Sequence, residues 1–215
     1  KKIISDGQQV RKGDVAFTIE GPTQKLLTSE RLVLNVMQRM SGIATKTHYL
    51  QGLCKGTKTK VIDTRKTTPG FRFFEKWAVV IGGGANHRYG LFDMILIKDN
   101  HVDFAGGIIE AIDAANSYLK KKKKKLAIEV ETRSLEEVKK VLTHGHVQRI
   151  MLDNYTPQQT LEAVKLINGK FEVESSGGIN ESNIASYAKC GVDFISIGAL
   201  THHIKSLDLS LKAIK

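Results

Sequence analysis

The feature that most constrains the fold is the alternation of short apolar stretches with amphipathic segments through most of the chain. Apolar stretches of this length are typical of strands that are buried on both faces of a parallel sheet. Amphipathic segments between them are typical of the helices that connect parallel strands. Six strands are predicted, at residues 61–63, 94–97, 126–130, 149–152, 171–173 and 194–197.

Capping patterns predict where three of the connecting helices begin. SLEE at 134–137 and TPQQ at 156–159 are capping boxes, the second with proline at the first helical position. The first of these helices is expected to end near Thr143. Asn180 is expected to cap a third helix, which ends near Cys190. The regular succession of six β/α units favours an α/β fold with a parallel, TIM-like β/α barrel over an open doubly wound sheet.

The first part of the chain has a different pattern. Residues 3–27 carry turn signals between short apolar stretches and are expected to form short strands. Thr28 is expected to cap a helix that runs to about residue 44 or beyond, with Arg39 on its exposed face. Arg31 lies in the first turn of this helix, where a cation opposes the helix dipole, and this suggests an anionic partner.

Polar side chains or glycines follow every predicted strand. In a β/α barrel the carboxyl ends of the strands meet at one mouth, which is where active sites lie. The six strand ends are therefore expected to converge on one site. They comprise residues 63–66, 98–101, 129–131, 153–154, 174–178 and 198–201.

The last two strand ends predict a phosphate site. SSGGIN at 175–180 and SIGALTHH at 196–203 place glycines where backbone N–H groups can approach a phosphate closely. Either loop alone would be a structural turn as often as a phosphate-binding loop. Their occurrence together, in the final two units, favours phosphate binding.

The carboxylates at the strand ends suit a metal ion. Mg²⁺ prefers one or two carboxylates together with substrate phosphate oxygens, and Glu131 and Asp153 offer such a pair. Ribose hydroxyl groups are another ligand for them, and charge compensation for Lys66 and Lys98 is an equal alternative. Glu129 shares a strand face with Glu131, but Glu131 lies nearer the carboxyl end and is preferred.

The stretch 63–101 is unusually basic and contains two pairs of neighbouring cations. Adjacent cations repel each other unless an anion lies between them, so this stretch predicts an anion-binding wall. Arg72 and Lys76 are expected to be surface residues of the helix within it. The neighbouring pairs are Arg65 with Lys66, and His87 with Arg88.

The net charge of +11 does not by itself indicate a nucleic-acid partner. Six of the positive charges form one run at 120–125, which is expected in a solvated loop between a helix and a strand. Aromatic residues do not alternate with the basic ones, and no zinc-finger pattern is present. Small anionic ligands explain the excess equally well, and no nucleic-acid partner is predicted.

The sequence predicts an intracellular, reducing environment. Cys54 and Cys190 lie far apart and outside any CxxC pair, so neither a disulfide framework nor a structural zinc site is indicated. No apolar run reaches the ~18 to 20 residues of a membrane span, and no signal-peptide pattern is present. We therefore expect a cytoplasmic protein with no membrane contact. The chain opens in mid-pattern at Lys1, so upstream sequence is expected to be missing.

Several blocks of the sequence resemble the quinolinate phosphoribosyltransferase family, also called nicotinate-nucleotide pyrophosphorylase (carboxylating). The resemblance covers nearly the whole chain in the family's order, and DTRKTTPG with NHR and LIKDNH is its most specific part. The matching blocks are ERLVLNVMQRMSGIAT, DTRKTTPGFR, EKWAVVIGGGANHRYGLFDMILIKDNH, IEVET, MLDN, SSGGIN and FISIGALTHH.

The resemblance implies both an architecture and an activity. Members of the family pack an N-terminal α/β domain against an incomplete α/β barrel and assemble as dimers or oligomers of dimers. Residues 1–44 would be part of the first domain with its connecting helix, and residues 45–215 the barrel. The implied reaction joins quinolinate to phosphoribosyl pyrophosphate with Mg²⁺, and yields nicotinate mononucleotide, pyrophosphate and CO₂ for NAD synthesis.

The resemblance also implies roles for individual residues. Lys66 would contact phosphoribosyl pyrophosphate, while Glu131 and Asp153 would lie near the ribose and the metal. The quinolinate-binding residues would be Arg65, His87, Arg88 and Lys98, with Arg31 reaching in from a neighbouring subunit. The 5′-phosphate loops would be formed by Ser176, Gly177 and Gly198. The implied catalytic set is Lys66, Lys98, Glu131 and Asp153.

Two other functions remain open at this point. One is a related phosphoribosyltransferase-like enzyme that acts on another pyridine or on a molybdenum-linked substrate. The other is a barrel protein that binds nucleic acid or another polyanion through its positive charge, although such binding would not require carboxylates and glycine loops at strand ends.

Overall fold

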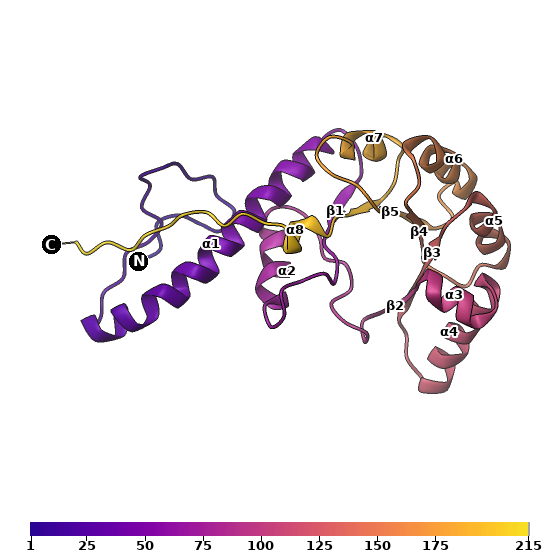
Figure 1. Cartoon of the computed structure of the whole chain (residues 1–215), viewed down its shortest axis with the longest axis horizontal. Helices are drawn as coiled ribbons and strands as arrows, with labels where there is room; N and C mark the ends of the chain where they lie inside the picture. The colour runs from indigo at the N-terminus through magenta and orange to yellow at the C-terminus, as the bar shows by residue number, and fades with distance from the viewer. Residues whose placement is uncertain (215) are drawn as a thin grey trace.

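The computed structural model describes residues 1–214, and its main body is a curved parallel sheet with helices along its outer side (Figure 1). The strands are β1 (Lys60–Ile62), β2 (Met94–Ile97), β3 (Ala127–Thr132), β4 (Arg149–Asp153), β5 (Glu172–Ser176) and β6 (Phe194–Ser196). The helices are α1 (Thr23–Leu53), α2 (Arg72–Ile81), α3 (Asp99–Ala105), α4 (Ile108–Lys122), α5 (Leu135–His144), α6 (Pro157–Ile167), α7 (Ile184–Lys189) and α8 (Ala199–His202).

The sheet confirms the predicted incomplete barrel. Its strand order is β1-β6-β5-β4-β3-β2, and every pair is parallel. β1 and β2 are the two edges, and within residues 1–214 they do not pair with each other. The segment that joins them carries α2 and touches β1 through a single parallel bridge between Ile62 and Ala85.

The two faces of the sheet differ in polarity. Alternate residues of a strand point to opposite faces, and the outer set packs against the helices in one apolar core. That set includes Val61, Val130, Ile150, Leu152, Val173 and Ile195. The inner face carries Glu129, Arg149, Glu174 and Ser196. The inner face of the sheet is therefore polar and carries buried charges.

The six predicted strands are confirmed, with their bounds shifted by a few residues. The TPQQ capping box is also confirmed, because Thr156 accepts from the Gln159 N–H and Gln159 Oε1 accepts from the Thr156 N–H at 2.9 Å. Ser134 accepts from the Glu137 N–H as expected, but the Glu137 carboxylate turns back to the Arg133 N–H, so that box is only half formed.

Two predicted helix starts are wrong. α1 begins at Thr23, directly after Pro22, and Thr28 lies inside the helix, where its hydroxyl donates to the Gln24 carbonyl. Asn180 does not cap α7, which starts at Ile184. The Asn180 side chain instead accepts from the Ser182 N–H in the preceding turn, because short polar side chains compete for nearby backbone groups.

The expectation of short strands over 3–27 is wrong apart from one antiparallel bridge, between Lys2 and Phe17. The apolar residues of this segment, such as Val15 at 56% exposure, meet no second layer that would bury them. The first three lysines of the 120–125 run are also not in a loop, since they form the last turn of α4. Cations are favourable there because they face the negative end of the helix dipole.

The proposed division of the chain at residue 44 falls within α1, which continues without interruption to Leu53 (Figure 1). The domain boundary therefore stays a prediction. Among residues 1–214 no helix is both long enough and apolar enough to cross a bilayer.

We predict that Leu152→Ala lowers the free energy of unfolding by about 2–5 kcal/mol, because it opens a cavity where the outer face of β4 meets the helices. Leu152 is fully buried. Urea unfolding followed by circular dichroism measures the change. Leu166→Ala is the matched control, because Leu166 lies on α6 and is 38% exposed. Equal losses for both variants would contradict the assignment of the core to this face.

Candidate functional site

The carboxyl ends of β3 and β4 bring Glu131 and Asp153 together, as predicted. Burial, followed by the charges of Asp153 and Asp99, raises the pKa of Glu131, whereas the Lys98 charge opposes this shift. Burial also raises the pKa of Asp153, with Lys98 and Lys66 acting in the opposite direction. These mutual effects show that the two lysines and the carboxylates share one mouth.

The donor set at this mouth fits a hard divalent cation. Carboxylate oxygens are the ligands that Mg²⁺ prefers, and Glu131 and Asp153 end two neighbouring strands. The charges of Asp153 and Asp99 contribute to the raised pKa of Glu131, and the charge of Asp99 contributes to the raised pKa of Asp153. A nearby positive charge therefore stabilises this group of carboxylates. Lys66 and Lys98 supply part of that charge.

The two glycine loops open onto the same mouth. Ser176 ends β5, and Gly177 follows with φ +93°, a left-handed conformation that favours glycine. Gly198 lies between β6 and α8, and a Cβ there would come within 3.2 Å of the Lys66 side chain. The absence of a side chain at Gly198 thus lets Lys66 lie against the loop that follows β6.

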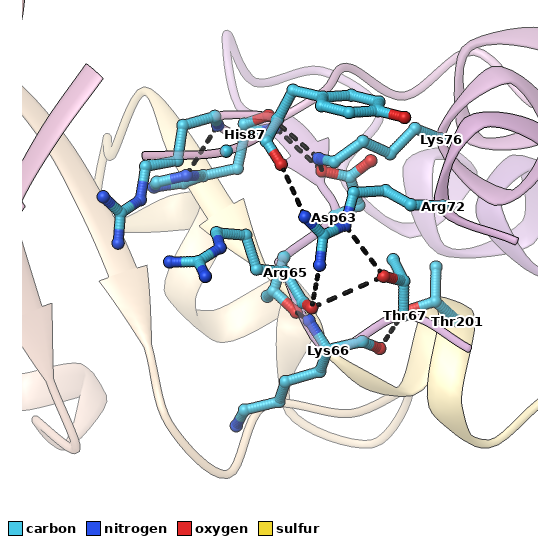
Figure 2. A network of polar contacts seen from close by, with 12 residues as sticks. Asp63, Arg65, Lys66, Thr67, Arg72, Lys76, His87 and Thr201 are labelled. Atoms are coloured by element: carbon cyan, nitrogen blue, oxygen red, sulfur yellow. Dashed lines mark hydrogen bonds and ion pairs between the residues drawn. The ribbon is translucent and has the colours of Figure 1, made fainter. Parts of the chain in front are cut away.

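The Arg65–Lys66 loop and the His87–Arg88 segment face one another (Figure 2). Figure 2 shows the Arg65 side chain directed toward the His87 segment and Lys66 directed away from it. Burial, and then the charge of Arg65, lowers the pKa of Arg88, so the two guanidinium groups are close enough to repel. An anion between them would relieve this repulsion, which agrees with the predicted anion-binding wall.

His87 is buried, and neither of its ring nitrogens is free to bind a ligand. Its Nδ1 accepts from the Arg88 N–H at 2.7 Å, and its Nε2 lies 2.8 Å from Glu129 Oε2. The Glu174 carboxylate is 3.5 Å from the same Nε2. Both ring nitrogens therefore already have protein partners.

A buried charged cluster lies behind His87, on the inner face of the sheet. Burial raises the pKa of Glu129 to about 7. Burial, and then the Glu129 charge, raises the pKa of Glu174 to about 8. Arg149 compensates the cluster, because it donates to Glu174 at 3.2 Å and stacks on the Phe194 ring at 3.9 Å.

Within residues 1–214, His87, Glu129 and Glu174 form a group whose spacing would suit a metal ion. Arg149 supplies positive charge directly beside Glu174. Arg149 also pairs with Glu172, and among the described residues Glu129 Oε1 and Glu174 Oε1 are buried without a hydrogen-bond partner. The raised pKa values of Glu129 and Glu174 agree with this, because a protonated carboxyl group is less costly to bury than an ionised one.

The prediction that Lys76 lies on the surface is wrong. Lys76 is 2% exposed, and its ammonium donates to Asp63 Oδ1 at 2.5 Å and to the His87 carbonyl at 2.9 Å (Figure 2). Arg72 is also not a free surface residue, because it donates to the Thr67 hydroxyl and the Tyr89 carbonyl. Both side chains bind the loops that carry the predicted site.

The expectation of an exposed Arg39 is wrong as well. Arg39 donates to Glu75 Oε1 from Nε and Nη2, and to the Thr201 carbonyl at 2.7 Å. Glu75 is fully buried and also accepts from the N–H and the hydroxyl of Thr68. The helical period could have predicted the burial of Glu75, because Glu75 lies three residues before the buried Ala78 and therefore shares its face of the helix.

Arg31 is the one predicted site residue that does not join the mouth. It is exposed, in the first half of α1, which projects away from the barrel (Figure 1). The remaining predicted residues lie at the strand ends or in the loops around them. The class of protein defined by these observations is an incomplete β/α barrel with a cationic mouth, glycine loops and a carboxylate pair.

The chain belongs to the quinolinate phosphoribosyl transferase family. Residues 43–212 match the C-terminal domain of that family, and residues 1–41 match its N-terminal domain. This confirms the resemblance inferred from the sequence.

Named relatives agree with this membership. The chain is 47% identical to a chloroplastic nicotinate-nucleotide pyrophosphorylase (carboxylating) of Arabidopsis thaliana, over 96% of this chain and 63% of the relative. It is 42% identical to a probable nicotinate-nucleotide pyrophosphorylase (carboxylating) of Bacillus subtilis, over 96% of this chain and 70% of the relative. The chain thus spans just under two thirds of the length of the plant relative.

Solved structures show the same fold. NadC from Streptococcus pyogenes superposes with a TM-score of 0.91 at 41% identity, over 98% of this chain and 72% of that one. The nicotinate-nucleotide pyrophosphorylase of Francisella tularensis gives a TM-score of 0.91 at 43% identity, over 98% and 73%.

We predict that the buried cluster makes stability depend on pH. The pKa of Glu174 rises from 4.5 to about 8, so between these values the folded state holds a proton that the unfolded state has released. The free energy of unfolding therefore falls as the pH rises through this window. Glu174→Gln stays neutral, and we expect its profile in urea unfolding to be flatter.

Glu162→Gln is the control for this measurement, because Glu162 is an exposed residue of α6 and does not contact Arg149. It should keep the slope of the unsubstituted protein. Parallel profiles for Glu174→Gln and the unsubstituted protein would show that Glu174 is not the titrating group.

Proposed function

We propose that the protein transfers the phosphoribosyl group of phosphoribosyl pyrophosphate to quinolinate, with loss of CO₂, to give nicotinate mononucleotide and pyrophosphate. The supporting observation is the convergence of a paired-guanidinium wall, two glycine loops and a carboxylate pair at one barrel mouth. The names of the relatives, which include quinolinate phosphoribosyltransferase (decarboxylating), support the same reaction.

Quinolinate has two carboxylates, and the cationic wall offers groups for both. Arg65 and Arg88 repel each other in the absence of an anion, and Lys98 lies at the adjoining strand end. Planar guanidinium groups hold carboxylates in a fixed orientation. In this proposal His87 lines the pocket and supports Arg88, because both of its ring nitrogens already have partners.

The phosphoribosyl donor would lie across the opposite side of the mouth. Ser176, Gly177 and Gly198 offer backbone groups to the 5′-phosphate, and Lys66 is placed against Gly198 to meet the pyrophosphate. Glu131 and Asp153 would hold Mg²⁺, which supplies positive charge for the leaving pyrophosphate. They would also favour positive charge that develops on the ribose.

The reaction follows from this placement. The clamped carboxylates orient the ring nitrogen of quinolinate toward the anomeric carbon of the ribose, and the nitrogen attacks as the bond to pyrophosphate breaks. The nitrogen becomes cationic and can accept the electron pair of the carbon–carboxylate bond, so CO₂ leaves and a proton takes its place on the ring. Lys66 stabilises the departing pyrophosphate throughout.

We also propose that the protein acts as a homodimer or a larger oligomer of dimers, in which Arg31 reaches the mouth of a neighbouring subunit. Arg31 is exposed and lies in the N-terminal half of α1, which projects from the barrel (Figure 1). Apolar side chains beside it are also exposed, among them Leu32 at 70% and Leu27 at 66%. Cytoplasmic location stays a prediction, since the names of plant relatives specify chloroplasts or mitochondria.

We predict that Arg65→Lys and Arg88→Lys each lower kcat/KM for quinolinate about 10- to 100-fold, because an ammonium group cannot form a bidentate contact with a carboxylate. The measurement is formation of nicotinate mononucleotide from quinolinate and phosphoribosyl pyrophosphate with Mg²⁺. Arg133→Lys is the matched control, because Arg133 is exposed and pairs with Asp103 and Glu137. Near-normal turnover by both site variants would rule out these roles.

We predict that chelation of divalent metal stops turnover and that added Mg²⁺ restores it. Glu131→Gln and Asp153→Asn should each raise the Mg²⁺ concentration for half-maximal rate about tenfold or more, since each removes one carboxylate ligand. Glu136→Gln is the control, because this exposed glutamate lies in the first turn of α5. An unchanged Mg²⁺ dependence in both site variants would exclude this metal assignment.

A further inference from the structure

Helix α2 places two consecutive charged residues, Glu75 and Lys76, in buried positions. Adjacent residues of an α-helix point about 100° apart, so the two side chains leave the helix toward different neighbours. Burial of a charge is costly unless it is paired and fully hydrogen-bonded. Each of these two charges is paired and hydrogen-bonded in its own network. One network fixes the segment that carries Arg88, and the other fixes the loop that carries Lys66.

Lys76 holds the segment that carries Arg88. Its ammonium donates to Asp63 Oδ1 and to the His87 carbonyl, and Asp63 Oδ1 also accepts from the His87 N–H at 2.9 Å. The buried ion pair therefore fixes the backbone of His87 on both sides, because Asp63 accepts from its N–H and Lys76 donates to its C=O. Arg88 follows directly, and its own N–H is held by the His87 ring.

Glu75 holds the loop that carries Lys66. It accepts from the Thr68 N–H at 3.0 Å and hydroxyl at 2.9 Å, and from Arg39. Arg39 continues the network to the Thr201 carbonyl, and the Thr201 hydroxyl donates to the Lys66 carbonyl at 2.7 Å. The loop is thus tied to α1, α2 and α8 at once.

We infer that Glu75 and Lys76 are positioning residues with separable effects, Lys76 for the dicarboxylate and Glu75 for the phosphoribosyl donor. This rests on the proposed function, and neither residue touches the substrates. Arg65 lies on the loop that Glu75 holds, so loss of Glu75 also affects the dicarboxylate. Asp63 begins the strand end that continues to Lys66, but that loop keeps its bonds to Glu75 and Thr201 when Lys76 is lost. Loss of Lys76 therefore acts on the dicarboxylate, through His87 and the Arg88 that follows it.

The test compares KM for the two substrates in three variants. Lys76→Met is combined with Asp63→Asn, so that no unpaired charge remains buried. This double variant should raise KM for quinolinate about tenfold and leave KM for phosphoribosyl pyrophosphate within about twofold. Glu75→Gln, which turns an amide N–H toward the donors of Thr68, should raise KM for phosphoribosyl pyrophosphate about tenfold.

Val79→Ala is the matched control for general destabilisation, because Val79 is a fully buried residue of the same helix with an apolar side chain. Its two KM values should stay within about twofold of those of the unsubstituted protein. Should the double variant not fold, Lys76→Arg alone serves, because it keeps a positive charge beside Asp63 but changes the donor geometry, with an expected rise of about threefold in KM for quinolinate only.

Equal changes of both KM values in the Lys76 variant, an unchanged KM for phosphoribosyl pyrophosphate in Glu75→Gln, or altered KM values in Val79→Ala would overturn the positioning roles while leaving the proposed function intact. Failure of the unsubstituted protein to turn over quinolinate and phosphoribosyl pyrophosphate would instead overturn the proposed function, and the positioning roles with it.

Discussion

The structure depends on the two-residue alternation of its parallel strands. Because the helices cover only the outer face of the sheet, every second strand residue must be apolar to pack against them. Val130, Ile150 and Ile195 meet this requirement. The strand residues that alternate with these point to the inner face, where no helix packs against them, so they need not be apolar. The inner face can therefore hold Glu129, Arg149 and Glu174. The same alternation that builds the core also gathers charge inside the barrel.

Charge inside the barrel is tolerated because each charged residue has at least one partner, although Glu129 Oε1 and Glu174 Oε1 have none within residues 1–214. Arg149 bridges glutamates of β5 and stacks on Phe194, and His87 lies against the glutamates of β3 and β5. Asp63 and Lys76 form a second buried pair at the end of β1. Such pairs contribute little net stability, but the loss of one member leaves the other unpaired at a high cost. They hold the surrounding loops in one arrangement, which is what oriented carboxylate and phosphate contacts require.

Sequence reasoning succeeded where the signal was local. The six strands were recovered from short apolar stretches, and the start of α6 from the TPQQ capping box. It failed for side chains whose hydrogen-bond partners lie far away in the sequence. Arg39 looked like an exposed polar position of a helix, yet its partners Glu75 and Thr201 lie 36 and 162 residues away. Residues 3–27 had strand-like composition, but a strand requires a neighbour, and only one bridge formed, while the residues from Thr23 onward joined α1.

The sequence by itself determined the order of the six strands, and which chemical groups end each strand. Strand burial, helix capping and turn formation depend on nearby residues, so these features can be read along the chain. The tertiary structure decided which charges face one another: that Lys76 turns inward to Asp63, that both ring nitrogens of His87 are engaged, and that Arg31 lies apart from the mouth. Desolvation and pairing of charges depend on distances between strands and helices, and the curvature of the sheet and the packing of the helices on it set those distances.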